Sequence, residues 1–466
     1  MELSTLLGEV EAVEIRGDPG RTDVIAVTHD SRAVVAGALF CCVPGLRVDG
    51  HDYAPDAVAA GATALLNERL LPLDVTQVRV VDVRAAMAPV AAAFHGHPSR
   101  RLRVAGITGT NGKTTTAHLL HAVLEHHGWP TGLLGTLTGT RTTPEATELQ
   151  ARLAAFAAGD KHAVVMEVSS HALELHRVDA TRFAVAVFTN LSPEHLDFHE
   201  SMDVYFRAKA RLFEPERTEV AVVNADDPYG RALLDAALVP TRPFSLVDAV
   251  DLEVSASGST FTWEGQRVHL RLGGVFNVAN ALAAATAAQV LGVPPATVAE
   301  ALSAAPVVPG RFETVDAGQS FAVVVDYAHT PAGLEQVLLA ARALAAGGRV
   351  LLVFGCGGDR DAAKRPAMGE VAARLADHAV LTTDNPRREG PAAIAAAVLA
   401  GVARPGVVEV EPDRRQAIAR ALAAAGPGDV VVVAGKGHET EQVLADRTIP
   451  FDDRVVAREE LAGLQP

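Results

Sequence analysis

The sequence of 466 residues has few cysteines, no cluster of basic residues and no long apolar run. Its three cysteines, Cys41, Cys42 and Cys356, are too few for a disulfide framework, and the first two are adjacent. This cysteine usage is typical of a reducing compartment. Residues 1–17 also lack the basic start and apolar core of a secretion signal, so we expect a cytoplasmic protein.

Two further absences exclude classes of partner. The longest stretch without charge, residues 272–299, contains Asn277, Asn280 and a pair of prolines, so it predicts a buried alanine-rich helix and no membrane insertion. The net charge is -15, and the absence of a Lys/Arg-rich block argues against a nucleic-acid partner. The 49% hydrophobic and 21% charged residues are typical of a globular protein and exclude a disordered or fibrous one.

The length predicts about three domains at roughly 150 residues each. Short segments over residues 1–98 predict a small N-terminal α/β domain. Over residues 99–308, apolar strands such as 185–189 alternate with helical stretches, which predicts a central domain with a mostly parallel sheet. The same alternation restarts over residues 309–466 and predicts a Rossmann-like, doubly wound C-terminal domain. The fold class is therefore α/β.

Residues 106–116 have the pattern of a phosphate-binding loop. They lie between an expected strand at 103–105 and an expected helix at 117–127, as such loops do. Backbone N–H groups would hold phosphates, Lys113 would add charge, and the Thr114 hydroxyl would face Mg²⁺. Ile107 occupies a position where the standard pattern has glycine, so the loop is a variant. The alternative, a plain glycine turn, accounts less well for Gly-Lys-Thr between a strand and a helix. The central domain is thus predicted to be a P-loop ATPase.

The variant loop Gly-Thr-Asn-Gly-Lys-Thr-Thr at 109–115 resembles that of the Mur ligases and their folylpolyglutamate synthase relatives. Mur ligases are the ATP-dependent amino-acid ligases of peptidoglycan synthesis. The resemblance extends over nearly the whole chain. It implies that ATP is a substrate and that Mg²⁺, as two ions, is the cofactor.

Two further motifs follow apolar strands of the central segment. Val-Met-Glu-Val-Ser-Ser-His at 165–171 carries Glu167, an oxygen ligand suited to Mg²⁺. Residues 189–199 carry His195, His199 and two carboxylates. Parallel sheets bind ligands at the carboxyl ends of their strands, so this crowding favours a functional site over structural histidines.

The Mur ligase resemblance assigns roles in this region. It implies that Lys209 is carbamylated to N6-carboxylysine, which turns a cation into a carboxylate able to hold a second Mg²⁺; on local grounds alone it would be a solvated helix lysine. Pro193-Glu194 stands where the family commonly has Arg-Asp. The predicted catalytic residues are Lys113, Glu167, His195 and Lys209, and the predicted metal ligands are Thr114, Glu167, His195 and Lys209.

The ATP site is predicted to draw on two domains. Residues 274–282 resemble the adenine-side motif of the family, where Asn280 offers an amide to the purine edge. A local alternative for Asn280 is the N-cap of the alanine-rich helix. The resemblance also places Arg311 on the phosphates and Asp326 on the ribose. The predicted ATP-binding residues are Gly109, Thr110, Asn111, Gly112, Lys113, Thr114, Thr115, Asn280, Arg311 and Asp326.

The N-terminal motifs at 30–32, 37–40 and 49–51 resemble those of the family members that add the third residue of the peptide, the MurE type. This resemblance predicts that UDP-MurNAc-L-Ala-D-Glu is bound by Ser31, Thr142, Thr143, Ser169 and Arg177. Leu175 stands where a glutamine contact is common, so we expect that contact to be missing. On local grounds alone the threonines and Arg177 would be turn and surface residues.

Three strand ends of the C-terminal segment, at 355–361, 384–387 and 435–439, are expected to meet on one rim. Asp-Asn-Pro-Arg at 384–387 resembles the motif of ligases that add meso-2,6-diaminopimelate. That amino acid differs from lysine by a distal carboxylate, which a guanidinium group binds with two parallel hydrogen bonds. The predicted diaminopimelate-binding residues are Arg360, Asp384, Asn385, Pro386, Arg387, Gly435 and Glu439.

The sequence therefore predicts a ligase in which ATP phosphorylates the D-glutamyl carboxylate and the diaminopimelate amine attacks the acyl phosphate, with His195 or a carboxylate as the proton acceptor. Three alternatives remain: a lysine-adding ligase of the same family, a folylpolyglutamate synthase, and a P-loop switch that needs only residues 106–116. The N-terminal domain and residues 384–387 disfavour the second. We also expect no nucleic-acid partner and a monomer.

Overall fold

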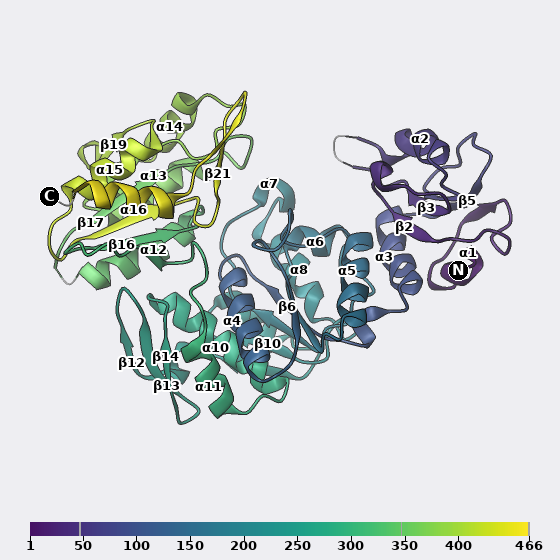
Figure 1. The fold of residues 1–466 in the computed structure, drawn as a ribbon, viewed down its shortest axis with the longest axis horizontal. Helices are drawn as coiled ribbons and strands as arrows, with labels where there is room; N and C mark the ends of the chain where they lie inside the picture. The colour runs from purple at the N-terminus through teal and green to yellow at the C-terminus, as the bar shows by residue number, and fades with distance from the viewer. Residues whose placement is uncertain (46–47, 346, 465–466) are drawn as a thin grey trace.

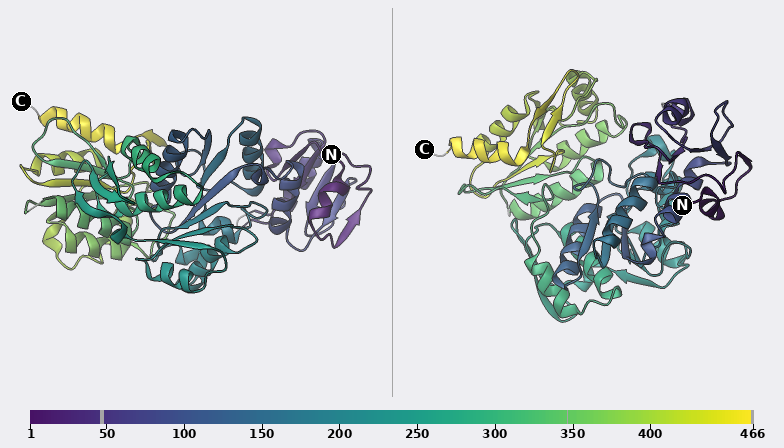
Figure 2. Two further views of the ribbon diagram at one scale, coloured as in Figure 1. Left: turned by 90° about the horizontal axis from the view of Figure 1, so that it is seen from below. Right: turned by 45° about the vertical axis from the view of Figure 1, so that its right-hand side comes forward.

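The computed structural model describes residues 1–45, 48–345 and 347–464. The chain forms three lobes in sequence order, with the two termini at opposite ends of the molecule (Figures 1 and 2). The fold is α/β with mostly parallel sheets, as predicted. No sheet of the described residues joins strands from both sides of 98/99 or of 308/309, and these two domain boundaries stay predictions.

The N-terminal lobe contains a five-stranded sheet in the order β1-β5-β4-β3-β2, with β1 as an antiparallel edge strand. Its strands are β1 (Glu14–Arg16), β2 (Ala26–Thr28), β3 (Ala38–Cys41), β4 (Ala64–Asn67) and β5 (Thr76–Arg79). Its helices are α1 (Leu3–Leu6), α2 (Ala54–Ala59) and α3 (Val83–Phe94). Helix α3 packs against α5 of the central lobe and so joins the two lobes (Figure 1).

The central lobe contains a six-stranded parallel sheet in the order β11-β10-β9-β6-β8-β7. Both faces are buried: Ile107 of β6 packs toward α4, α10 and α11, whereas Val104 packs toward α5, α6 and α8. This two-sided burial explains the continuous apolar strands of the sequence. The strands are β6 (Arg103–Thr108), β7 (Thr131–Leu134), β8 (Ala163–Glu167), β9 (Val185–Phe188), β10 (Ala221–Asn224) and β11 (Thr241–Phe244). The helices are α4 (Lys113–His126), α5 (Ala146–Ala158), α6 (Ser170–Glu174), α7 (Leu196–His199), α8 (Met202–Ala210), α9 (Pro228–Asp235), α10 (Val275–Val290) and α11 (Pro295–Ala304).

Several local predictions for the central lobe are wrong. Strand β6 continues to Thr108 and α4 begins at Lys113, so the phosphate loop is shorter than expected. The alanine-rich stretch forms two helices, because the proline pair starts α11 at a position where proline is tolerated. Helix α10 begins after Gly274, so Asn280 is an interior residue and not an N-cap. The three-stranded antiparallel sheet of β12 (Val250–Val254), β13 (Ser259–Trp263) and β14 (Gln266–Leu270) was not anticipated.

The C-terminal lobe contains a six-stranded sheet in the order β15-β16-β20-β17-β18-β19, parallel except for β15. Helices cover both faces, as a doubly wound fold requires. The strands are β15 (Glu313–Thr314), β16 (Ala322–Asp326), β17 (Val350–Phe354), β18 (His378–Leu381), β19 (Val408–Val410) and β20 (Val430–Ala434), with a hairpin of β21 (Glu441–Val443) and β22 (Thr448–Pro450). The helices are α12 (Pro331–Ala345), α13 (Arg365–Leu375), α14 (Pro391–Leu399), α15 (Arg414–Ala424) and α16 (Asp453–Leu464).

Two absences noted in the sequence concern membrane-spanning helices and disulfides. Over the described residues, no helix combines the length and the apolar character that a bilayer crossing requires. Cys41, Cys42 and Cys356 are all buried and unpaired.

Candidate active site

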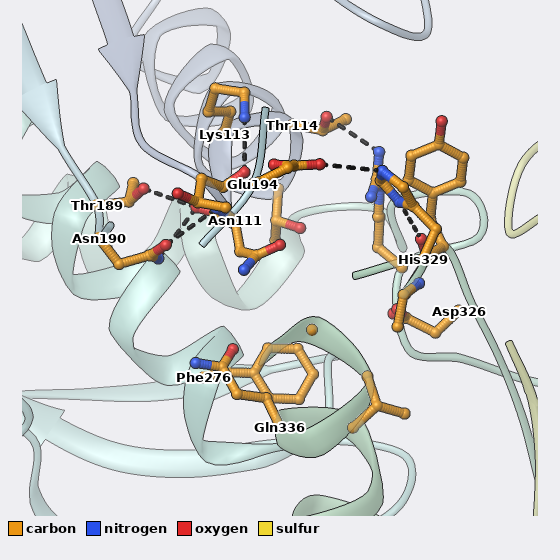
Figure 3. A pocket seen from close by; sticks show the side chains of 18 of the residues that line it. Asn111, Lys113, Thr114, Thr189, Asn190, Glu194, Phe276, Asp326, His329 and Gln336 are labelled. Atoms are coloured by element: carbon orange, nitrogen blue, oxygen red, sulfur yellow. Dashed lines mark hydrogen bonds and ion pairs between the residues drawn. The ribbon is translucent and has the colours of Figure 1, made fainter. Parts of the chain in front are cut away.

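A cavity of about 990 Å³ opens between the central and C-terminal lobes. It is lined by residues that follow β6, β8, β9 and β10 on one side and β16, β17, β18 and β20 on the other. Figure 3 shows part of it, with Asn111, Lys113 and Glu194 facing Asp326 and His329. The carboxyl ends of two parallel sheets thus meet in one space, which is where such sheets bind ligands.

The phosphate loop connects β6 to α4 at the wall of this cavity. Gly112 has a φ of +85°, and a Cβ atom there would lie 2.3 Å from Asn280 Oδ1, so only glycine fits. Lys113 Nζ donates hydrogen bonds to the carbonyl oxygens of Gly109 at 2.9 Å and Thr110 at 2.8 Å. The loop is held by Asn190 Oδ1, which accepts from the Asn111 N–H at 2.9 Å. With the N-terminus of α4 beside it, the loop forms an anion-binding site.

Glu167 and Thr114 form a pair of oxygen donors beside this loop. Glu167 is 1% exposed at the end of β8, and its Oε2 accepts a hydrogen bond from Thr114 Oγ1 at 3.0 Å. Its Oε1 accepts from the Thr136 N–H at 2.8 Å. Among the described residues no three His, Cys, Asp or Glu side chains gather as a complete metal site. Mg²⁺ is usually held by one or two protein oxygens together with waters and phosphates, so this pair fits that ion.

Lys209 lies on α8 and is 1% exposed, so the solvated surface lysine considered above is excluded. Its Nζ donates to the Gly109 carbonyl at 2.9 Å and lies 4.7 Å from the centroid of the Tyr205 ring. Burial, and then the nearby Lys113 ammonium, lower the pKa of Lys209 well below its usual value. Burial therefore favours the neutral amine over the charged ammonium form.

Two side chains, Glu194 and His329, join the lobes across the cavity, and neither was assigned a role from the sequence. Glu194 Oε1 lies 3.4 Å from Nε2 of His329, which belongs to the C-terminal lobe, and its Oε2 lies 3.7 Å from Nε2 of His195 (Figure 3). Burial raises the pKa of Glu194, but the hydrogen bond and charge of His329, together with the charges of His195 and Lys113, hold it well below its usual range. Burial lowers the pKa of His195 to about 4, so its imidazole is neutral near pH 7.

The remaining residues predicted to bind ATP lie around the same cavity. Arg311 Nη2 donates to Thr114 Oγ1 at 3.1 Å and so reaches from the C-terminal segment to the phosphate loop. Asp326 accepts the N–H groups of Phe312 and Ala328, each at 2.7 Å, and burial raises its pKa. Asn280 lines the cavity, as does Phe276, an aromatic residue of the 274–282 motif that sequence reasoning did not use.

The three strand ends of the C-terminal lobe meet as expected. Asn385 Nδ2 donates to Glu439 Oε2 at 2.7 Å, and Arg387 Nη1 donates to the Gly358 carbonyl at 2.7 Å. Arg387 has a φ of +53°, a left-handed backbone conformation that is uncommon for residues other than glycine. Of the residues predicted to bind diaminopimelate, all but Pro386 line the cavity: Arg360, Asp384, Asn385, Arg387, Gly435 and Glu439.

The residues predicted to bind the UDP-linked substrate are more dispersed. Thr142 and Ser169 line the cavity. Thr143 is buried behind them and donates to the Glu167 carbonyl at 3.0 Å. Arg177 forms an ion pair with Glu145 at 2.8 Å and does not line the cavity. Ser31 lies in the N-terminal lobe just after β2, away from the cavity. Their substrate contacts stay predictions.

Three family descriptions match consecutive parts of the chain. Residues 23–95 match the Mur ligase family catalytic domain, residues 107–288 match the Mur ligase middle domain, and residues 310–437 match the Mur ligase glutamate ligase domain. The chain belongs to the Mur ligase family.

Two similar proteins from Streptomyces are both named UDP-N-acetylmuramoyl-L-alanyl-D-glutamate–2,6-diaminopimelate ligase. The Streptomyces coelicolor protein is 46% identical over 494 residues and the Streptomyces avermitilis protein is 47% identical over 494 residues; each alignment covers 99% of this chain and 97% of the relative. A solved structure of a ligase with this name is 32% identical, has a TM-score of 0.68, and matches over 97% of both chains.

Proposed function

We propose that the protein is an ATP-dependent ligase that joins meso-2,6-diaminopimelate to the D-glutamyl carboxylate of UDP-MurNAc-L-Ala-D-Glu. The observation that carries this proposal is that one cavity contains the phosphate loop, the Thr114–Glu167 oxygen pair and the arginine-bearing rim around Arg387. Relatives of that name, matched over 99% of this chain, support the same substrates. The protein would act as a monomer in the cytoplasm, during synthesis of the peptidoglycan precursor.

The first half-reaction transfers the γ-phosphoryl group of ATP to the D-glutamyl carboxylate, which gives an acyl phosphate and ADP. The phosphate loop binds the phosphates through its N–H groups, while Lys113 and Arg311 neutralise charge as the phosphoryl group moves. Thr114, Glu167 and His195 would hold Mg²⁺, which supplies further neutralisation of the phosphate charge. Lys113 now bonds two carbonyl groups of its own loop, so it must exchange them for phosphate oxygens.

The second half-reaction forms the amide. The diaminopimelate amine attacks the acyl carbon, the C–O bond to phosphate breaks, and inorganic phosphate and one proton leave. The amine must arrive neutral, so a base has to accept this proton. The neutral His195 imidazole is one such base when it does not hold Mg²⁺, and a carboxylate of the cavity is the other.

Carbamylation of Lys209 belongs to the same proposal. A neutral, buried amine attacks carbon dioxide to give a carbamate and releases a proton, and the depressed pKa of Lys209 favours this reaction. The resulting carboxylate would stand beside Lys113 and Gly109, where it would hold a second Mg²⁺. Protein carboxylates are the ligands that Mg²⁺ prefers.

The rim around Arg387 favours diaminopimelate over lysine. Arg360 and Arg387 both line the cavity, and a distal carboxylate pairs with a guanidinium group that lysine would leave unpaired. Arg360 is exposed and Arg387 half-buried in this structure. Once a bound amino acid encloses such an arginine, leaving it without a partner costs on the order of a few kcal/mol, which is enough for strong discrimination. A folylpolyglutamate synthase would need neither this rim nor the N-terminal lobe, and a P-loop switch would need only the loop.

The activity is tested by omitting substrates one at a time. We expect phosphate release only when ATP, UDP-MurNAc-L-Ala-D-Glu and diaminopimelate are all present, with a product whose mass is that of the UDP-tripeptide. ATP hydrolysis of the same rate without the UDP-linked substrate would favour the P-loop switch and contradict the ligase.

A further inference from the structure

Lys436, which follows β20, is a lysine whose side chain is fully buried. Its Nζ donates to Asn385 Oδ1 at 3.1 Å, to Glu439 Oε2 at 3.0 Å and to the Glu441 carbonyl at 2.6 Å. An ammonium group has three N–H donors, so all three are used. A buried cation that is paired and fully hydrogen-bonded is costly to remove and has no donor left for a ligand.

The partners of Lys436 line the cavity, whereas Lys436 itself does not. Glu439 Oε2 accepts a second hydrogen bond, from Asn385 Nδ2 at 2.7 Å. Asn385 Oδ1 accepts a second one as well, from the Val443 N–H at 2.9 Å. The side chains of Asn385 and Glu439 are thus held to each other and to one shared ammonium group.

This network uses one carboxylate oxygen of Glu439, Oε2, as its acceptor and leaves Oε1 available to accept another hydrogen bond. Within the described part of the chain, no residue donates a hydrogen bond to Glu439 Oε1. A carboxylate oxygen at the cavity wall, with its partner oxygen fixed by two donors, is an acceptor for an ammonium group.

We propose that Lys436 is a positioning residue for the incoming amino acid: it fixes Glu439 and Asn385 so that Glu439 Oε1 accepts an ammonium group of that amino acid. Lys436 acts only through these two side chains and does not touch the substrate. The inference rests on the proposed function, because it takes the amino acid to bind at the rim of the C-terminal lobe. The inference assigns Lys436 the role of ordering the rim. Loss of Lys436 should then weaken binding of the amino acid and leave binding of ATP unchanged.

The test replaces Lys436 with methionine, which keeps most of the side-chain volume and removes the charge. In Lys436→Met we expect the KM for diaminopimelate to rise about tenfold or more, since a charge-assisted hydrogen bond to the ligand loses its fixed acceptor. The KM values for ATP and for UDP-MurNAc-L-Ala-D-Glu should stay within twofold, and kcat at saturating diaminopimelate within a few-fold. The matched control is Lys161→Met, which removes a partly exposed lysine of the central lobe and should change none of these values.

A double-mutant cycle separates positioning from a general structural effect. If Lys436 acts through Glu439, then Lys436→Met should add little to the KM increase already caused by Glu439→Gln. Additive increases, or an equal rise in the KM for ATP, would overturn the proposal.

A second measurement needs no variant and keeps the proposal testable if Lys436→Met does not fold. In a crystal structure of the wild-type protein with diaminopimelate, Lys436 Nζ should keep its three acceptors and an amino group should lie on Glu439 Oε1. A contact between Lys436 and the amino acid would overturn the proposal. Failure of the wild-type protein to use diaminopimelate at all would instead contradict the proposed function, so the two failures are distinguishable.

Discussion

At the scale of single residues, two lysines of the site bind the same carbonyl oxygen, that of Gly109. Lys113 Nζ and Lys209 Nζ both donate to the Gly109 carbonyl, each at 2.9 Å. Two buried amines this close disfavour each other's protonation, and the pKa of each is lowered by burial. Converting Lys209 to a carbamate would replace the repulsion between two cations with attraction between an anion and Lys113.

The first residue-scale prediction concerns Lys209. Lys209→Ala should lose turnover by at least about a hundredfold, because the metal-holding carboxylate is removed. Adding a short carboxylate such as acetate or propionate should restore part of the activity, measured as phosphate release. Lys161→Ala is the surface control. Full activity of Lys209→Ala without any added carboxylate would contradict the carbamate role.

From the sequence we predicted most of the residues that line the site, but not which of their side chains contact each other. Glu194 was noted as one carboxylate of residues 189–199 and as a departure from Arg-Asp, and His329 received no role. Their contact joins residues 135 positions apart on two lobes, and no local pattern reveals such a contact. Lys436 likewise received no role within the strand end at 435–439, because a lysine is expected at the surface unless its three acceptors are known.

At the scale of elements, strand ends and the turns behind them set the geometry of the site. Apolar runs predicted the central and C-terminal strands because those strands are buried on both faces. The antiparallel strands β12 to β14 were missed although β13 alternates buried and half-buried residues, which is the period-two signal of a strand. Helix α4 was expected to begin at residue 117, yet the phosphate loop ends at Gly112 and the helix starts at Lys113.

At the scale of elements, a second prediction concerns Asp179 in the turn between α6 and β9. Burial raises the pKa of Asp179, but hydrogen bonds from His176 at 2.7 Å and Arg217 at 2.5 Å outweigh it and bring the pKa to about 2. This folded-state value lies below the unfolded value of about 3.9, so the stabilisation is present above pH ~4 and is lost as the pH falls toward 2. Asp179→Asn should therefore destabilise the protein by about 2 kcal/mol at pH 7.

Thermal unfolding from pH 7 down to pH 3 measures this effect. The difference in Tm between the wild type and Asp179→Asn should shrink as the pH drops below about 4. The control is Asp235→Asn, which changes an exposed aspartate of α9 and should not alter Tm at any of these pH values. A difference that grows on acidification would contradict the assigned pKa.

At the scale of the whole molecule, the site exists only where two lobes meet. Arg311 bonds Thr114, and His329 contacts Glu194, so the C-terminal segment completes the phosphate site (Figure 3). Ser31, predicted to contact the UDP-linked substrate, lies in the N-terminal lobe away from the cavity, and that lobe packs on the rest through α3 and α5 (Figure 1). Sequence reasoning predicted three lobes and an α/β fold, whereas the contacts between lobes required the structure.

The choice of amino acid is the central claim, and a competition assay tests it most directly. The protein is incubated with ATP, UDP-MurNAc-L-Ala-D-Glu and equal concentrations of meso-2,6-diaminopimelate and L-lysine, and the two UDP-tripeptides are quantified by mass spectrometry. The pairing of the distal carboxylate with Arg387 predicts at least about a hundredfold excess of the diaminopimelate product. Equal amounts of the two products, or an excess of the lysine product, would contradict the account.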